Sequence, residues 1–230
     1  MIKDAADYLR KTRRGAMFIL DGPSGSGKNA IIEKLMAADK NLKYSISVTT
    51  RAMREGEVEG NPYYFVSEKE YDKLLADDAF YEHVVSDYGG KRYGTLRSEV
   101  DSFLTVGQDV IFELDFPGLI QMKGKAPEDV VSIGILPPSI KQLKERLVAR
   151  GDKPEVIAKR MEMAITRLAY ISSYDYVVIN DKLEESVAKL QRVISGERMK
   201  RVRQIGLKDF MKQLLEEAKE ILSEALGTKS

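Results

Sequence analysis

The stretch Ala16-Met-Phe-Ile-Leu-Asp-Gly-Pro-Ser-Gly-Ser-Gly-Lys28 joins a short apolar run to a glycine-rich loop that ends in a lysine. The run Ala16–Leu20 has the length and composition of a buried strand, and a helical pattern begins at Asn29. Glycines let successive backbone N–H groups turn inward around phosphate oxygens, and the N-terminus of the following helix favours an anion. The stretch therefore predicts a P-loop, which binds the phosphates of a nucleotide.

The predicted nucleotide-binding residues begin with this loop and the first turn of the helix. They are Gly22, Pro23, Ser24, Gly25, Ser26, Gly27, Lys28, Asn29 and Ala30. Lys28 is expected to reach the β- and γ-phosphates and to offset charge in the transition state. Asn29 stands where the pattern G-x-x-x-x-G-K-[ST] has a hydroxyl that binds Mg²⁺. A carboxamide oxygen is also a metal ligand, so Asn29 is expected to bind Mg²⁺ weakly, directly or through a water molecule.

The rest of the chain alternates apolar runs with helical patterns. Further buried strands are expected at Tyr44–Thr49, Val110–Leu114, Val130–Leu136 and Tyr176–Ile179. Helical patterns lie near Asn29–Ala38, Leu96–Gly107, Ser139–Arg150, Pro154–Ser173 and Leu183–Gln204. Strands separated by helices indicate βαβ units. The expected fold is α/β: a P-loop NTPase core with a parallel five-stranded sheet flanked by helices. Pro117–Gly118 is expected to form a tight turn.

Several segments depart from this alternation. Residues 1–14 are interpreted as a partly helical N-terminal extension without a catalytic role, and residues 15–204 as the main domain. Within that domain, residues from about 48 to 97 are rich in charge, glycine and tyrosine, and they predict a small mixed α/β insertion. Residues from about 146 to 164 predict a short lid. Asp21, at the start of the P-loop, either points away from the phosphates or helps to position a metal-bound water.

Residues 205–230 predict a C-terminal amphipathic helix, because apolar residues recur there at helical spacing. The stripe consists of Leu207, Phe210, Met211, Leu214, Leu215, Ala218, Ile221, Leu222, Ala225 and Leu226. We expect it to pack on the body of the protein or on a dimer mate. A monomer and a homodimer both remain open.

Composition excludes several kinds of function. A net charge of +1 gives no global field that would attract nucleic acid or an acidic membrane, so neither partner is expected. The basic residues from Arg198 to Arg203 are expected to form a solvated helix face. The absence of cysteine excludes disulfides, thiolate metal sites and a cysteine nucleophile, and it suits a cytoplasmic location. The single histidine, His83, argues against a histidine-based triad or zinc cluster.

A second motif follows the predicted P-loop unit. It reads Thr49-Thr50-Arg51-x-x-Arg54-x-Gly56-Glu57-x-x-Gly60-x-x-Tyr63-x-Phe65. Two arginines three residues apart, together with tyrosine hydroxyls, suit a phosphomonoester dianion, because guanidinium groups bind such oxygens in a bidentate manner. The motif resembles the signature of guanylate kinases, and the resemblance runs from about Gly15 to Gln204. It implies an ATP:GMP phosphotransferase of purine nucleotide metabolism that uses Mg²⁺ with ATP, makes ADP and GDP reversibly, and also accepts dGMP.

The resemblance also implies which residues bind GMP. Its phosphate is assigned to Arg51, Arg54, Tyr63 and Tyr93. Guanine presents N1–H and an exocyclic amino group on one edge, and one carboxylate can accept hydrogen bonds from both. Glu82 matches the family position for this role, and Ser47 and Thr95 match positions that contact the base through hydroxyls. Glu113 and Asp115 end a predicted strand, where they are expected to orient the acceptor.

The resemblance places further arginines around the ATP phosphates. Phosphoryl transfer needs positive charge around a dispersed anionic transition state. Arg146, Arg150 and Arg160 resemble the family's lid arginines, and with Lys28 and Arg51 they form the predicted catalytic set. Asn180 resembles a residue of the adenine-side loop and completes the predicted ATP site.

Two alternatives to an active guanylate kinase stay open. The first is a non-catalytic interaction module built on the same fold, which Asn29 favours but the intact loop Gly22–Lys28 opposes. The second is a P-loop kinase with a different nucleotide acceptor. Glu82 discriminates against the second, because a carboxylate there can accept from both donors of guanine, which adenine does not match.

Overall fold

The core of this computed structural model is a parallel β-sheet, and the structure describes the whole chain except residues 1, 3, 87–89 and 228–230. Among the described residues the sheet has five strands in the order β2-β7-β1-β8-β9. They are β1 (Met17–Asp21), β2 (Leu42–Tyr44), β7 (Asp109–Glu113), β8 (Val130–Leu136) and β9 (Tyr176–Ile179). Every neighbouring pair is parallel. The predicted five-stranded parallel sheet is confirmed.

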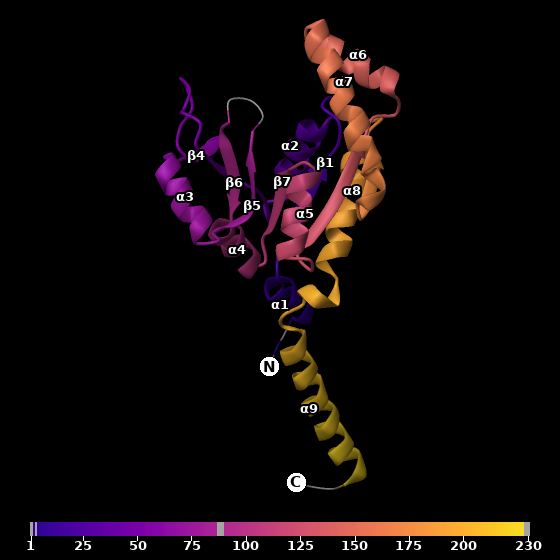
Figure 1. The fold of residues 1–230 in the computed structure, drawn as a ribbon. Coiled ribbons are helices and arrows are strands. Elements are labelled where there is room, and N and C mark those ends of the chain that lie inside the picture. Colours follow the sequence, from indigo (N-terminus) through magenta and orange to yellow (C-terminus); the bar gives the residue numbers. More distant parts are fainter. Residues whose placement is uncertain (1, 3, 87–89, 228–230) are drawn as a thin grey trace.

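Helices cover both faces of this sheet (Figure 1). The helices are α2 (Lys28–Ala38) and α8 (Leu183–Arg198) on one face, and α4 (Arg97–Thr105) and α5 (Phe116–Lys125) on the other. Alternate residues of β1 point to opposite faces. Phe18 and Leu20 pack with α2 and α8, whereas Met17 and Ile19 pack with α4 and α5. All four side chains are fully buried, so β1 holds the P-loop at the centre of the molecule.

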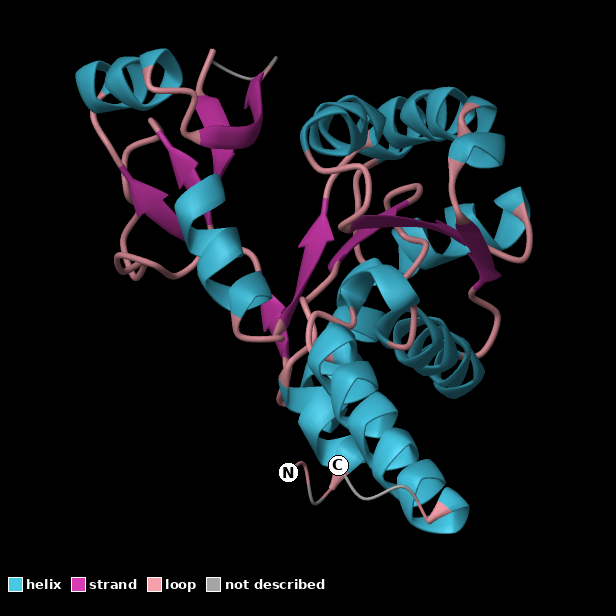
Figure 2. Ribbon diagram, turned by 90° about the horizontal axis from the view of Figure 1, so that it is seen from below, coloured by secondary structure: helices cyan, strands magenta, loops and turns pink. Residues whose placement is uncertain are grey.

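A second, mixed sheet lies beside the core. Its described strands, in the order β4-β3-β6-β5, are β3 (Ser47–Thr49), β4 (Tyr63–Phe65), β5 (Phe80–Val85) and β6 (Arg92–Leu96). Helix α3 (Glu68–Ala76) packs on it through Tyr71, which stacks on Phe80 at 4.8 Å between ring centroids. Figure 2 shows the two groups of strands in magenta, each with its own helices. This sheet carries the motif that surrounds Arg51.

The prediction of one strand at Tyr44–Thr49 is wrong. The N–H of Ser45 donates to the carbonyl of Ile111 at 3.1 Å, which continues the pairing of β2 with the core. Ser47 instead pairs with Tyr63 in the second sheet. The chain therefore changes sheets between residues 45 and 47. An apolar run alone does not show which sheet each half joins.

The turn expected at Pro117–Gly118 is also wrong, because both residues lie in the first turn of α5. The Asp115 carboxylate caps this helix and accepts a hydrogen bond from the N–H of Gly118 at 3.3 Å. Proline is well suited to the start of a helix, where its missing N–H has no intrahelical partner to lose. Asp115 therefore starts α5, directly after the end of β7.

The remaining helices lie at opposite ends of the molecule (Figure 1). They are α6 (Ile140–Ala149), α7 (Pro154–Ala169), α1 (Ala5–Lys11) and α9 (Leu207–Leu226), with 3₁₀ turns at Ile171–Ser173 and Arg201–Arg203. Helices α6 and α7 project at one end, and α1 and α9 at the other. No residue of α9 is buried within the described chain, so the body does not cover its apolar stripe, and the expected packing on a dimer mate stays a prediction. Within the described ranges, no helix combines the length and the apolar character needed to cross a membrane.

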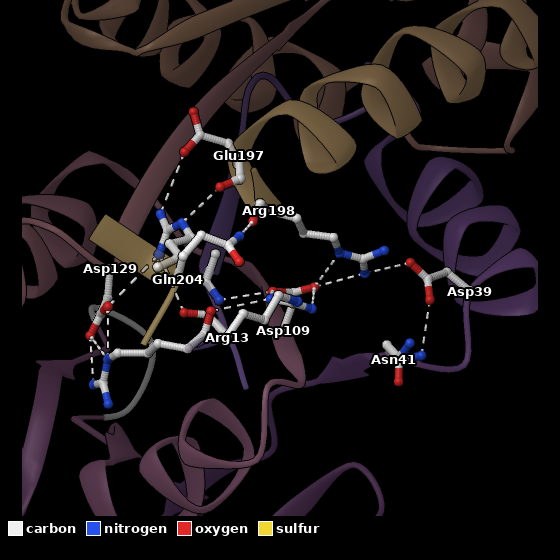
Figure 3. A network of polar contacts seen from close by, with 12 residues as sticks. Arg13, Asp39, Asn41, Asp109, Asp129, Glu197, Arg198 and Gln204 are labelled. Carbon is white, nitrogen blue, oxygen red and sulfur yellow. Dashed lines mark hydrogen bonds and ion pairs between the residues drawn. The ribbon is translucent and has the colours of Figure 1, made fainter. Parts of the chain in front are cut away.

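A buried ionic network ties the N-terminal extension to the core (Figure 3). The Asp109 carboxylate, with no solvent exposure, accepts hydrogen bonds from both terminal nitrogens of Arg13 at 2.8 Å and from Nε of Arg198 at 2.7 Å. Arg203 is also buried and bonds to the backbone carbonyl of Glu197. The expected solvated face from Arg198 to Arg203 is therefore wrong in part. Removing one member of such a buried pair costs about 3–5 kcal/mol, so this network is structural.

Candidate active site

The P-loop can be built only because two of its residues are glycines. At Gly22, a Cβ atom would lie 2.1 Å from the carbonyl oxygen of Ile135 on the neighbouring strand β8. Gly27 has φ +93°, and a Cβ there would lie 2.3 Å from Nδ2 of Asn180. Any side chain at either position would push the loop off the sheet. The sequence pattern that predicted the loop therefore reflects close packing on β8 and on the end of β9.

Asn180 supports the P-loop through hydrogen bonds. Its side-chain Nδ2 donates to the carbonyl of Ser26 at 2.7 Å, and its backbone N–H donates to the carbonyl of Leu136 at 2.7 Å. The side chain is 5% exposed, so Asn180 supports the loop instead of facing solvent. Its Oδ1 and the Oγ of Ser26 are both buried and have no hydrogen-bond partner among the described residues.

A cavity of about 640 Å³ opens above the loop, a volume in the range of small-molecule sites. Its described lining consists of Gly22, Ser24, Gly25, Gly27, Lys28, Asn29, Ala30, Glu113, Arg146, Arg150, Arg160, Met163 and Arg167. Pro23, Ser26 and Asn180, predicted with the others, do not line it. Within this described lining, one lysine and four arginines face a single carboxylate. The cavity therefore suits a polyanion such as a triphosphate.

Lys28 is the most enclosed cation of this cavity, with 6% of its surface exposed. Its Nζ donates to the carbonyl of Gly22 at 2.7 Å and lies 3.3 Å from Oε1 of Glu113. Burial lowers the pKa of Lys28, while the nearby Glu113 carboxylate opposes that shift. Glu113, predicted on the acceptor side, thus lies in the nucleotide cavity beside the lysine.

The three predicted lid arginines come from the two projecting helices. Arg160 on α7 donates to Oγ of Ser24 in the P-loop at 3.0 Å and to Oδ2 of Asp152 at 2.8 Å. Arg146 on α6 donates to the carbonyl of Asn180 at 2.9 Å. Arg150, at the end of α6, pairs with Asp152 at 3.4 Å. Contacts to Asp152, the P-loop and the carbonyl of Asn180 hold the three arginines, and all three line the same cavity.

On the second sheet, Arg51 lies among aromatic rings. Its guanidinium carbon is 5.4 Å from the ring centroids of both Tyr63 and Phe65, and its terminal nitrogen donates to Glu57 at 2.8 Å. The rings of Tyr63 and Tyr93 meet edge to face at 5.4 Å. Arg54 has an exposed side chain, and its N–H donates to Glu57 at 2.8 Å. These residues form one cluster, as the motif predicted.

Glu82 is buried within the same sheet. It is 3% exposed, and its Oε1 accepts a hydrogen bond from Oγ1 of Thr95, directly across from it on β6, at 2.7 Å. Burial raises the pKa of Glu82, and the bond from Thr95 opposes the rise. Ser47 begins β3, which pairs with β6. Asp115 caps α5, and its negative charge also raises the pKa of Glu82.

The two groups of residues occupy different sheets. Of the described residues around Arg51 and Glu82, none lines the cavity of Lys28. Tyr44 is within electrostatic reach of both groups: its pKa is raised by partial burial, then by the charge of Glu113 and by Tyr63. Glu113 thus borders the nucleotide cavity and lies within electrostatic reach of the acceptor side.

Comparison with known proteins agrees with this arrangement. The family model described as guanylate kinase matches residues 14–197, most of the chain. The chain belongs to the guanylate kinase family. A guanylate kinase of Novosphingobium aromaticivorans is 44% identical over 204 residues, which cover 88% of this chain and 91% of that protein. One from Bradyrhizobium diazoefficiens is also 44% identical, over 88% of this chain and 92% of that protein.

A solved structure shares the fold. The crystal structure of guanylate kinase from Anaplasma phagocytophilum superposes with a TM-score of 0.67 at 31% sequence identity. The match covers 87% of this chain and 95% of that one. The architecture of core sheet and second sheet is therefore that of a guanylate kinase.

Sequence reasoning missed one part of this guanylate kinase site. Arg167 on α7 lines the cavity, forms an ion pair with the buried Asp21, and approaches the carbonyl of Gly22 at 3.3 Å. Tyr174 donates from its hydroxyl to the other oxygen of Asp21, and the N–H of Gly22 donates to Asp21 at 2.6 Å. Asp21 therefore points away from the phosphates, the first of its two expected roles. These residues are about 150 positions apart, so no local pattern joins them.

Few residues of the described cavity lining carry side-chain oxygen atoms that suit a metal ion. Within the described ranges, no group of three or more His, Cys, Asp and Glu side chains could hold a metal ion by itself. Asn29 and Glu113, whose side chains carry oxygen atoms, do line the cavity. Mg²⁺ typically takes few protein ligands and completes its shell with substrate phosphates and water. This donor set fits an ion that arrives with ATP.

Proposed function

We propose that this chain transfers the γ-phosphate of ATP to GMP reversibly, giving ADP and GDP, with the residue roles set out below. The observation that carries the proposal is that each of the two sheets holds a different kind of anion-binding site. One carries a strongly cationic P-loop cavity, and the other carries an arginine–tyrosine cluster with a buried carboxylate. A donor and an acceptor nucleotide need those two kinds of site.

At the ATP site, the loop backbone binds phosphate oxygens and Lys28 compensates the charge of the transferred group. Arg146, Arg150 and Arg160 surround the phosphates from the lid, where they stabilise the transition state and exclude water. The contact of Arg160 with Ser24 supports this role, because it joins α7 to the P-loop. Asn180 acts by holding the loop in shape.

At the GMP site, Arg51, Arg54, Tyr63 and Tyr93 bind the phosphate dianion. Glu82 accepts hydrogen bonds from N1–H and the amino group of guanine, and Thr95 and Ser47 complete the contacts to the base. Nothing in these contacts involves the ribose, which agrees with acceptance of dGMP. Glu113 and Asp115 orient the acceptor from the end of β7. Bringing the two sheets together aligns the acceptor oxygen with the γ-phosphate.

Mg²⁺ is the proposed cofactor, bound together with ATP. Asn29 and Glu113 are the residues of this chain that would hold it, since both line the cavity and carry side-chain oxygen atoms. When bound, the ion would supply positive charge that offsets the charge of the phosphates. Lys28 and the lid arginines compensate the remaining negative charge of the phosphates.

The test of the function is a panel of acceptors. With ATP and Mg²⁺, ADP release should be fast with GMP and at least about 10³-fold less efficient with AMP, UMP or dTMP, because only guanine satisfies a buried carboxylate. Absence of GMP-dependent turnover at high enzyme concentration contradicts the proposal. GMP binding without turnover would favour an interaction module, and efficient use of another monophosphate would favour a different kinase.

Replacing Asn29 with serine should lower the Mg²⁺ concentration needed for half-maximal rate by roughly fivefold, the effect of about 1 kcal/mol of improved contact. A hydroxyl at this position is the usual magnesium ligand of a P-loop. A magnesium titration of the GMP-dependent rate measures the shift. Asn41→Ser, outside this cavity, is the matched control. An unchanged titration in Asn29→Ser would show that Asn29 does not limit metal binding.

A further inference from the structure

Helix α9 exposes a long apolar stripe to solvent. Its twenty residues span about 30 Å. Figure 1 shows it projecting from the body beside α1, at the opposite end from α6 and α7. Met211 is 46% exposed, Ile221 66% and Leu226 67%. A stripe of this length on a soluble protein marks an interaction site.

The first turns of α9 are held by the rest of the chain. The N–H of Ile2 donates to Gln213 at 2.6 Å, the hydroxyl of Tyr8 lies 3.5 Å from Asp209, and Gly206 packs against Thr12. Farther along the helix, Gln213 bonds to Glu217 and Lys219 bonds to Glu216, both within α9. The part of α9 beyond Gln213 is about 13 residues long, and an isolated helix of that length is marginal in water unless its apolar face is covered. The last three turns therefore need a partner.

The spacing of the stripe is that of a two-helix coiled coil. Its central residues are Leu207, Met211, Leu214, Ala218, Ile221 and Ala225. The steps between them alternate between four and three residues, which is the heptad repeat of an a/d seam. A partner that presents the same repeat would interlock with it, and a second copy of this chain does so.

The order of large and small residues favours an antiparallel pair. In that arrangement Leu207 of one copy meets Ala225 of the other, and Leu214 meets Ala218. Each leucine thus fills the space above an alanine. A parallel pair would set Ala218 against Ala218 and Ala225 against Ala225, which leaves voids in the seam.

The charges agree with the same orientation. The first half of α9 carries Lys208 and Lys212 with Asp209, whereas the second half carries mostly glutamates. These are Glu216, Glu217, Glu220 and Glu224, with Lys219 as the basic residue among them. Antiparallel pairing places each acidic half beside a basic half, and parallel pairing would place two acidic halves together.

We propose that the apolar stripe of α9 joins two copies of this chain as an antiparallel two-helix coiled coil. The proposal does not depend on phosphoryl transfer. About ten residues per copy contribute, fewer than the roughly 20–30 per side of a standard interface. The dimer is therefore weak, and its population rises with protein concentration over the micromolar range.

Sedimentation velocity of the full chain across a concentration series tests the association. The wild-type protein should shift from monomer to dimer, and Leu214→Glu should raise the dissociation constant at least about tenfold, because it buries an unpaired charge in the seam. Lys189→Gln, an exposed position of α8, changes the net charge by the same amount outside α9 and should leave the constant unchanged. Turnover retained in both variants shows that they fold.

The natural absence of cysteine allows a test of orientation. In an antiparallel pair, Met211 of one copy lies opposite Ile221 of the other, while the two Met211 residues lie about 15 Å apart along the axis. Oxidation of a mixture of Met211→Cys and Ile221→Cys proteins should therefore give mixed disulfide dimers, and either variant alone should give few.

Several results would overturn the proposal. A wild-type chain that stays monomeric at all concentrations excludes the association, and a monomeric chain that sediments with lipid vesicles assigns the stripe to a membrane surface. A dimer unaffected by Leu214→Glu places the interface elsewhere. Disulfide dimers formed efficiently by each single-cysteine variant alone would show a parallel pair.

Discussion

Replacing Lys28 with methionine should lower kcat for GMP-dependent ADP release by at least about 10³-fold, the size of effect seen when one donor to a transition-state anion is removed. The methionine side chain keeps much of the length and volume of lysine but removes its charge. Coupled assays at saturating ATP and GMP measure kcat directly. Thermal unfolding should change little, because the β1–loop–α2 packing does not depend on the ammonium group.

The reason for so large an effect is the position of the ammonium group. Lys28 is 6% exposed, so its charge acts in a poorly solvated site where electrostatic interactions are strong. Its Nζ donates to the carbonyl of Gly22 and pairs with Glu113. Phosphate oxygens offer a stronger partner than either group. We therefore expect the ammonium group to bind the phosphates of ATP directly.

Lys34→Met is the matched control for this experiment. Lys34 lies on the same helix, but it is half-exposed and pairs with Glu184 at 3.4 Å, outside the cavity. Its replacement should leave kcat within about twofold of the wild type, as for most exposed positions. A Lys28→Met enzyme that retains a tenth or more of the wild-type kcat would remove Lys28 from the catalytic set.

Features carried by adjacent residues could be predicted from the sequence. The P-loop unit could be predicted because its apolar strand, glycines and lysine follow one another in the sequence. Each of these residue types is required there for a local physical reason. The Arg51 cluster was predicted for the same reason, since the span from Thr49 to Phe65 contains its main parts. The parallel sheet followed from the alternation of buried strands with helices.

Features that depend on distant pairing could not be predicted. The apolar residues from 44 to 49 join two sheets, and only the partners Ile111 and Tyr63 reveal the change. Pro117 resembles a turn signal until Asp115 is seen to cap a helix there. The Asp21–Arg167 pair links the loop to α7 across most of the chain. In each case the deciding interaction is tertiary, so local propensity gives no sign of it.

Replacing Glu82 with glutamine should lower kcat/KM for GMP by about 10²- to 10³-fold and leave the KM for ATP unchanged. A carboxylate offers acceptors on both oxygens, whereas a carboxamide offers one acceptor and one donor group. Since Thr95 already donates to Oε1, the amide nitrogen would face the N1–H or amino group of guanine. A buried donor that meets a donor loses its hydrogen bond and keeps its desolvation penalty.

Inosine monophosphate isolates this interaction, because it keeps N1–H and lacks the exocyclic amino group. The wild-type enzyme should prefer GMP over inosine monophosphate strongly, and Glu82→Gln should lose most of that preference. Glu128→Gln, an exposed carboxamide substitution outside the second sheet, is the control and should keep the wild-type ratio. An unchanged preference in Glu82→Gln would show that Glu82 does not contact the base.

The pH dependence of KM for GMP is a second test of the role of Glu82. Burial raises the pKa of its carboxyl group above the ordinary value, so it takes up a proton at a higher pH than an exposed glutamate. The protonated form has lost one acceptor, and KM for GMP should therefore rise as pH falls toward that pKa. Glutamine does not titrate, so this acid-side rise should be absent in Glu82→Gln. A rise of equal size in both enzymes would assign it to another group, such as the phosphate of GMP itself.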